Sequence, residues 1–331
     1  MRTLLYLLTF FISTEIFAQT KKAEDYGYKY LQTNFNGDNV DILIKFKKGE
    51  EQKKKPIFLF CQGSRPMPLI KYDEKGAYGV FPFKLDSLET AFHIVIIGKP
   101  FVPLIAEVKT LDENMCYQDS LTKKAPKKYS DRNYLDYYVD RNIKVIAFLQ
   151  KQPFISNKKL VVAGHSEGST VASKLASKTN KITHLIYASG NPLGRILSII
   201  QQDRITEIDS TSSTEYNFEF WQQVVKNKNK LDDTNGDTPK ATYDFSIPPI
   251  QYLQKLTIPV LVCYGTKDFS LPYNDYLRIE MIRQEKRNFS FKPYIGLEHN
   301  FFPIKENGKP NYDKYNWNNV ANDWWKWIKN N

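Results

Sequence analysis

The chain has 331 residues, of which 41% are hydrophobic and 25% are charged, and its formal net charge is +11. It is long enough to bury a large core, and its three cysteines exclude a disulfide framework. The lysines cluster in short polar stretches at 53–55 and 123–128, without the interleaved aromatic residues of a nucleic-acid groove. Attraction to acidic substrates or surfaces stays open.

The first residues predict a secretory signal peptide. A positive start at Met1 and Arg2 is followed by an apolar run over 4–12, and the segment ends with the small residue Ala18. We therefore expect residues 1–18 to be removed, which gives a secreted or periplasmic protein. A retained membrane anchor is the alternative, but the run is short for a membrane span, and nothing later in the chain is expected to cross a membrane.

The cysteines predict little covalent cross-linking. Cys61 and Cys263 lie inside apolar, strand-like runs, which favours burial as small hydrophobic residues. An odd number leaves at least one free thiol, and a bridge between Cys61 and Cys116 stays open.

The rest of the sequence alternates between strand-like and helix-like segments. Apolar runs and alternating apolar residues predict strands at 40–46, 56–61, 92–98, 159–163, 182–188, 258–264 and 289–295. Apolar residues at helical spacing predict helices at 135–149, 169–177, 274–285 and 317–328. This alternation predicts an α/β fold with a doubly wound, mostly parallel sheet.

One segment interrupts the alternation. Residues 195–256 are polar and aromatic, with helices expected at 196–202 and 216–226, and they are too many for an ordinary connection. We expect them to form a cap insertion in a core that comprises 19–194 and 257–331. The aromatic residues of the cap either line a substrate pocket or form a small core of their own: Tyr216, Phe218, Phe220, Trp221 and Tyr243.

The segment Gly164-His165-Ser166-Glu167-Gly168 has the pattern G-x-S-x-G. The pattern is common by chance, but here an expected strand precedes it and an expected helix follows it, as a nucleophile elbow requires. The turn is so sharp that side chains at the two glycine positions would clash. We therefore expect Ser166 to be a nucleophile above the carboxyl edge of the sheet, where the helix N-terminus favours negative charge.

A serine nucleophile needs a base, and the chain offers four histidines. His93 and His184 lie within expected strands, and His165 is next to Ser166 in sequence, so its side chain should point elsewhere. His299 follows the last expected strand. We therefore expect His299 to be the base.

The base needs an acid that fixes its tautomer and stabilises its charged form. Asp268 directly follows the strand at 258–264, whereas Glu298 adjoins His299 too closely to reach its ring, and Asp275 is the fallback. Ser166, Asp268 and His299 each follow a separate strand, at the edge where active sites of such sheets form. Their chain order is the one that this fold uses for a catalytic triad.

Four segments carry a resemblance to a known family: "GHSEG", "CYGTKD", "GLEHNF" and "FLFCQGS". With them the sequence resembles the α/β-hydrolase family, nearest to its dienelactone hydrolase-like, esterase and prolyl-oligopeptidase-like branch. The resemblance implies an oxyanion hole made by the backbone N–H of Glu167 and that of Gly63 or Ser64. Glu167 is thus expected to act through its N–H rather than its charge. Arg65, in the same loop as Gly63, either meets an acidic substrate group or lies on the surface.

Together these features predict a secreted serine hydrolase that cleaves a carboxylic ester through an acyl-enzyme on Ser166. The expected substrate is a small-molecule or carbohydrate-linked ester, and neither a cofactor nor a metal is expected. One alternative is a peptidase of prolyl-oligopeptidase type, although the sequence has no stretch for the long propeller domain usual in that family. Another is a binding protein that kept the fold without the activity. The oligomeric state stays open.

Overall fold

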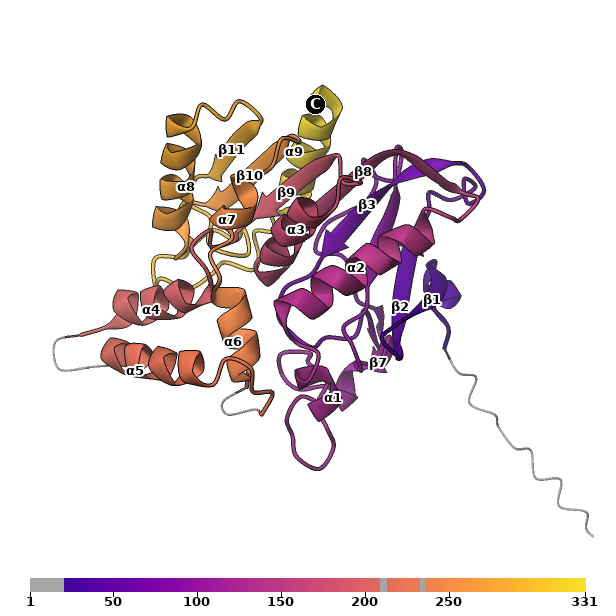
Figure 1. Ribbon diagram of the computed structural model, residues 1–331. Coiled ribbons are helices and arrows are strands. Elements are labelled where there is room, and N and C mark those ends of the chain that lie inside the picture. The colour runs from indigo at the N-terminus through magenta and orange to yellow at the C-terminus, as the bar shows by residue number, and fades with distance from the viewer. Residues whose placement is uncertain (1–20, 209–212, 233–235) are drawn as a thin grey trace, which may run out of the picture.

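The computed structural model describes residues 21–208, 213–232 and 236–331 (Figure 1). The expected signal peptide at 1–18 lies outside the described residues. The main sheet has eight strands in the order β1-β2-β6-β3-β8-β9-β10-β11. Their bounds are Lys29–Phe35 (β1), Asp38–Lys45 (β2), Lys55–Cys61 (β3), His93–Ile97 (β6), Ile155–His165 (β8), His184–Ala188 (β9), Val260–Gly265 (β10) and Phe289–Tyr294 (β11).

The main sheet is mixed but mostly parallel. Strand β2 runs antiparallel to both of its neighbours, β1 and β6. The other neighbouring pairs run parallel. The expectation of an α/β fold with a doubly wound, mostly parallel sheet is confirmed.

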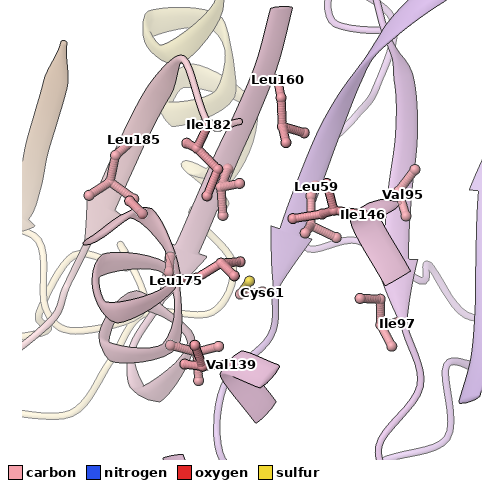
Figure 2. Close-up of a cluster of buried hydrophobic side chains, with 14 of the residues drawn as sticks. Leu59, Cys61, Val95, Ile97, Val139, Ile146, Leu160, Leu175, Ile182 and Leu185 are labelled. Atoms are coloured by element: carbon pink, nitrogen blue, oxygen red, sulfur yellow. The ribbon is translucent and has the colours of Figure 1, made fainter. Parts of the chain in front are cut away.

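Helices cover both faces of this sheet. On one face lie α2 (Leu135–Leu149), α3 (Glu167–Lys178), α7 (Ile250–Leu253) and α8 (Leu271–Arg283), and on the other lies α9 (Trp317–Asn330). Successive side chains of a strand point to opposite faces, so Leu59 and Cys61 pack under the first group of helices, while Phe58 and Phe60 pack toward α9. Figure 2 shows the cluster on the first face.

The expected central strands and long helices are present, with shifted ends. The last-but-one long helix begins at Leu271 rather than at 274, because Pro272 is tolerated in the first turn of a helix. Trp324 of α9 is fully buried, and its indole Nε1 lies 3.3 Å from the Cys263 sulfur. All three cysteines are buried and unpaired in the described residues. In the same part of the chain, no helix is both long and apolar enough to span a bilayer.

A second, three-stranded sheet has the order β5-β4-β7. Its strands are β4 (Ile70–Asp73), β5 (Gly76–Ala77) and β7 (Ile105–Glu107), and β4 pairs in parallel with β7. The small sheet therefore joins the segment that follows β3 to the segment that follows β6. Three short helical turns complete the elements of the core: η1 (Ala23–Tyr26), η2 (Val108–Thr110) and α1 (Lys127–Ser130).

The segment between β9 and β10 contains α4 (Arg195–Thr206), α5 (Ser213–Lys226), α6 (Pro239–Ser246) and α7. Helices α4, α5 and α6 pack on one another and form a group beside the sheet (Figure 1). In this group Trp221 stacks on Tyr243 with ring centroids 5.8 Å apart, whereas the side chains of Tyr216 and Phe218 are exposed. The assignment of 195–256 as a separate cap stays a prediction.

Candidate active site

Ser166 lies at a strained turn between β8 and α3. Its φ of 56° and ψ of −127° are rare for a residue with a side chain. A Cβ atom on Gly164 would lie 2.1 Å from the carbonyl oxygen of Gly168, and one on Gly168 would lie 2.0 Å from that of Cys61. Both positions therefore need glycine, because the backbone segments around Ser166 approach each other too closely for a side chain.

Replacing Gly168 by alanine is expected to destabilise the fold by about 3 kcal/mol or more, since backbone atoms must move to admit the Cβ. Thermal unfolding followed by circular dichroism measures the effect. Gly98→Ala is the matched control, because its Cβ would meet its nearest atoms at an ordinary 3.5 Å. Midpoints of the two variants within about 2 °C of each other would contradict the steric explanation.

The structure brings Ser166, His299 and Asp268 together. His299 Nε2 lies 2.9 Å from Ser166 Oγ, and His299 Nδ1 lies 3.0 Å from Asp268 Oδ2. The Asp268 carboxylate is fully buried, and its Oδ1 accepts a hydrogen bond from the backbone N–H of Ser270 at 2.8 Å. A carboxylate only accepts, so Nδ1 carries the proton of the neutral ring, and Nε2 is free to accept the serine proton.

The electrostatics of His299 suit a base that is held ready for protonation. Burial by itself lowers the pKa of His299, but the hydrogen bond and charge of Asp268 outweigh it and raise the pKa above the ordinary 6.5. The ring of Phe269 stacks on the imidazole, with centroids 4.9 Å apart, and restricts its rotation. These contacts fix the tautomer and the position of the ring.

His165 supports the loop that carries His299. Its Nε2 lies 3.0 Å from the backbone carbonyl oxygen of His299, and its ring packs edge-on against Trp317. Burial, followed by the charge of His299, lowers the pKa of His165 to about 3, so its ring stays neutral. The His165 side chain is thus used for positioning and does not contact Ser166 Oγ as a base would.

The residues expected to form an oxyanion hole lie around Ser166. A Cβ atom on Gly63 would be 3.8 Å from Ser166 Cβ, so the loop after β3 passes directly beside the serine. The hydroxyl of Tyr129 donates a hydrogen bond to the Ser64 carbonyl at 2.9 Å and fixes that loop. Glu167 is the first residue of α3, where a helix N–H has no intrahelical partner. The loop after β3 and the first turn of α3 therefore both adjoin Ser166, and the oxyanion hole stays a prediction.

Comparisons with known proteins agree on the fold of this chain. The family described as BAAT / acyl-CoA thioester hydrolase C terminal matches residues 136–291, a stretch that contains Ser166 and Asp268. The structure is similar to the Pyrococcus horikoshii acylaminoacyl peptidase, with a TM-score of 0.54 and 13% identity over 82% of this chain and 37% of that one. It is also similar to ferulic-acid-bound Est1E from Butyrivibrio proteoclasticus, with a TM-score of 0.52 and 16% identity over 82% and 91% of the two chains. The chain has the α/β-hydrolase fold.

A third structure similar to this chain is a Mycobacterium tuberculosis puromycin-hydrolyzing peptidase, with a TM-score of 0.50 and 13% identity over 83% of this chain and 36% of that one. This chain therefore spans little more than a third of either peptidase, 37% and 36%. A comparison with curated proteins finds no match. At these identities the likenesses establish the fold and leave the substrate open.

Two cavities of the structure meet at Ser64, Ser166 and His299. The larger, which we call the β4 cavity, has about 640 Å³ and extends from Ser166 toward β4. The smaller, which we call the α4 cavity, has about 370 Å³ and extends under α4. A substrate whose reacting carbonyl sits at Ser166 can therefore extend in two directions. Of the five aromatic residues named in the cap sequence, none lines either cavity.

A charged network connects α3 to α4 beside the α4 cavity. The buried Glu167 carboxylate pairs with Lys99, at 3.3 Å, and with Arg195 of α4. Arg195 also pairs with Asp237, and its guanidinium lies over the ring of Phe245. The role of the Glu167 N–H stays a prediction, and the structure adds a role for its charge, because the carboxylate ties the start of α3 to Lys99 and to α4.

Proposed function

We propose that the protein is a secreted serine hydrolase that cleaves a carboxylic ester through an acyl-enzyme on Ser166. The observation that carries the proposal is the hydrogen-bonded row from Ser166 Oγ to His299, at 2.9 Å, and from His299 to Asp268, at 3.0 Å. The row begins at a strained turn that stands above the carboxyl ends of the strands. Export rests on the sequence of residues 1–18 alone.

The reaction follows from this geometry. His299 Nε2 takes the hydroxyl proton as Ser166 Oγ attacks the ester carbonyl, and Asp268 stabilises the resulting imidazolium. The carbonyl oxygen gains negative charge, which we expect the N–H of Glu167 and that of Gly63 or Ser64 to stabilise. His299 then gives the proton to the departing alkoxide. Water, activated by the same ring, cleaves the acyl-enzyme and restores Ser166.

The rate is expected to depend on pH through His299. The base must be neutral to accept the serine proton, and its pKa is raised above 6.5. Activity should therefore fall as the pH drops through a value higher than that of an ordinary histidine. A profile of kcat/KM against pH measures this value in the free enzyme. An acidic limb with an apparent pKa below 6.5 would contradict the role of Asp268 in stabilising the charged ring.

A peptidase is the second candidate, because two of the structures similar to the hydrolase are peptidases. Both activities use the same triad, but an alkoxide leaves more readily than an amine. The experiment compares p-nitrophenyl esters of several acyl lengths and acetylated sugars with aminoacyl amides, beside labelling by a fluorophosphonate. We expect labelling and ester turnover. Turnover of amides but not esters would favour the peptidase, and neither labelling nor turnover would favour a binding protein.

A further inference from the structure

Two cationic side chains line the β4 cavity, and no acidic side chain lines it among the described residues. They are Arg65, in the loop after β3, and Lys71, in β4. Lys71 is only 9% exposed, and its Nζ donates a hydrogen bond to the backbone carbonyl of Pro68 at 3.1 Å. A cavity that opens at Ser166 thus carries an excess of positive charge.

Lys71 differs from the other buried lysines of the described chain. Each of those has an acidic partner: Lys55 pairs with Glu50, Lys99 with Glu167, and Lys174 with Asp136. Lys71 has a carbonyl instead, although burying an ammonium group without a counter-ion is costly. Burial accordingly lowers the pKa of Lys71, and only the Cys116 thiol acts in the opposite direction.

Arg65 also lacks an acidic partner in the part of the chain that the structure describes. The acidic residue that lines a neighbouring cavity together with Arg65 is already engaged. Asp237, which lines a neighbouring cavity with Arg65, pairs with Arg195 and accepts a hydrogen bond from Asn133 at 3.0 Å. The donors of Arg65 therefore stay available to a ligand in the β4 cavity.

The remaining wall of the β4 cavity is largely apolar and aromatic. Its side chains include Leu69, Val80, Phe302, Tyr312 and Tyr315. An apolar or aromatic chain would contact this wall, and a negative charge at its end would meet the two cations. Guanidinium and ammonium groups bind carboxylate, sulfate and phosphate through charge-assisted hydrogen bonds.

We propose that the β4 cavity recognises an anionic group of the substrate, held by Lys71 and Arg65. The substrate class is an ester with an apolar or aromatic arm that ends in a carboxylate, sulfate or phosphate. This inference rests on the proposed ester hydrolysis at Ser166 and names the substrate of that same site.

The test compares two chromogenic esters of equal length, a half-ester of a dicarboxylic acid and the same compound with its free carboxylate capped as a methyl amide. Wild-type protein is expected to favour the anionic ester in kcat/KM by about ten- to hundredfold. Lys71→Met, which keeps the side-chain volume, should lower the ratio of the two kcat/KM values, and so should Arg65→Gln. Lys75→Met is the matched control, because Lys75 is exposed in the turn after β4. It should keep the wild-type ratio.

The anion and the reaction can be tested separately. Inhibition of the wild-type enzyme by inorganic phosphate, by inorganic sulfate and by a monocarboxylate ranks the three anionic groups. Calorimetric binding of the half-ester to Ser166→Ala protein, lost in Ser166→Ala/Lys71→Met protein, would support the anion site even if no ester is cleaved. Ester cleavage with equal rates for the two esters, or equal binding to both proteins, would overturn the anion site and leave the proposed hydrolysis standing.

Discussion

Ser166→Ala is expected to lower kcat by about a millionfold, because it removes the atom that attacks the ester carbonyl. The residual rate would come from the oxyanion hole and substrate binding alone. Initial rates on the ester that wild-type protein cleaves best measure the loss. Labelling by a fluorophosphonate should disappear in parallel, since the label reacts with the same oxygen.

Ser177→Ala is the matched control for this experiment. Ser177 lies near the other end of α3, and its Oγ donates a hydrogen bond to the carbonyl of Lys174 at 2.8 Å. Its loss should change neither the rate nor the labelling. If Ser166→Ala protein were labelled as strongly as the Ser177→Ala control, another residue would be the nucleophile and the acyl-enzyme on Ser166 would be wrong.

The central strands could be predicted from sequence because both of their faces are buried. Continuous apolar runs such as those of β3 and β10 are typical of such strands. Strand β1 was missed because it lies at the sheet edge, half exposed, and mixes polar with apolar residues. The sequence did carry a signal for this hairpin, because the pair Asn36-Gly37 directly follows the strand and Asn-Gly favours a tight turn. In the structure the two residues have φ of 52° and 84°, as such a turn requires.

The candidate site was predictable only where its signals are local. Ser166, Asp268 and His299 each follow a strand, and strand ends can be read from sequence. The structure brings their side chains into one row, and their catalytic roles stay predictions. Lys71 and Arg195 gave no comparable signal, because their importance depends on tertiary contacts. Lys71, on the small sheet that β4 forms with β7, lines one cavity together with Ser166, and Arg195 of α4 lines the other.

Asp268→Asn is expected to lower kcat by about 10⁴-fold while the fold is kept. The asparagine oxygen can still accept the N–H of Ser270, so the loop after β10 should hold its position. Its amide N–H, however, can donate a hydrogen bond to His299 Nδ1, which favours the tautomer with hydrogen on Nε2. That nitrogen then cannot accept the proton of Ser166. The thermal midpoint should change little, which separates the effect from simple unfolding.

The pH profile of Asp268→Asn protein distinguishes the loss of an acid that orients His299 from a general loss of structure. Without the bond and charge of Asp268, burial alone acts on His299, so its apparent pKa should fall relative to that of wild-type protein. Asp275→Asn is the control, because Asp275 accepts a hydrogen bond from Tyr264 at 3.0 Å and was the fallback acid. Its kcat should stay within about twofold of wild type, as for a surface group outside the triad. A larger loss of kcat in Asp275→Asn than in Asp268→Asn would reverse the assignment of the acid. The carboxylate whose charge stabilises the imidazolium is the one whose removal must lower kcat more.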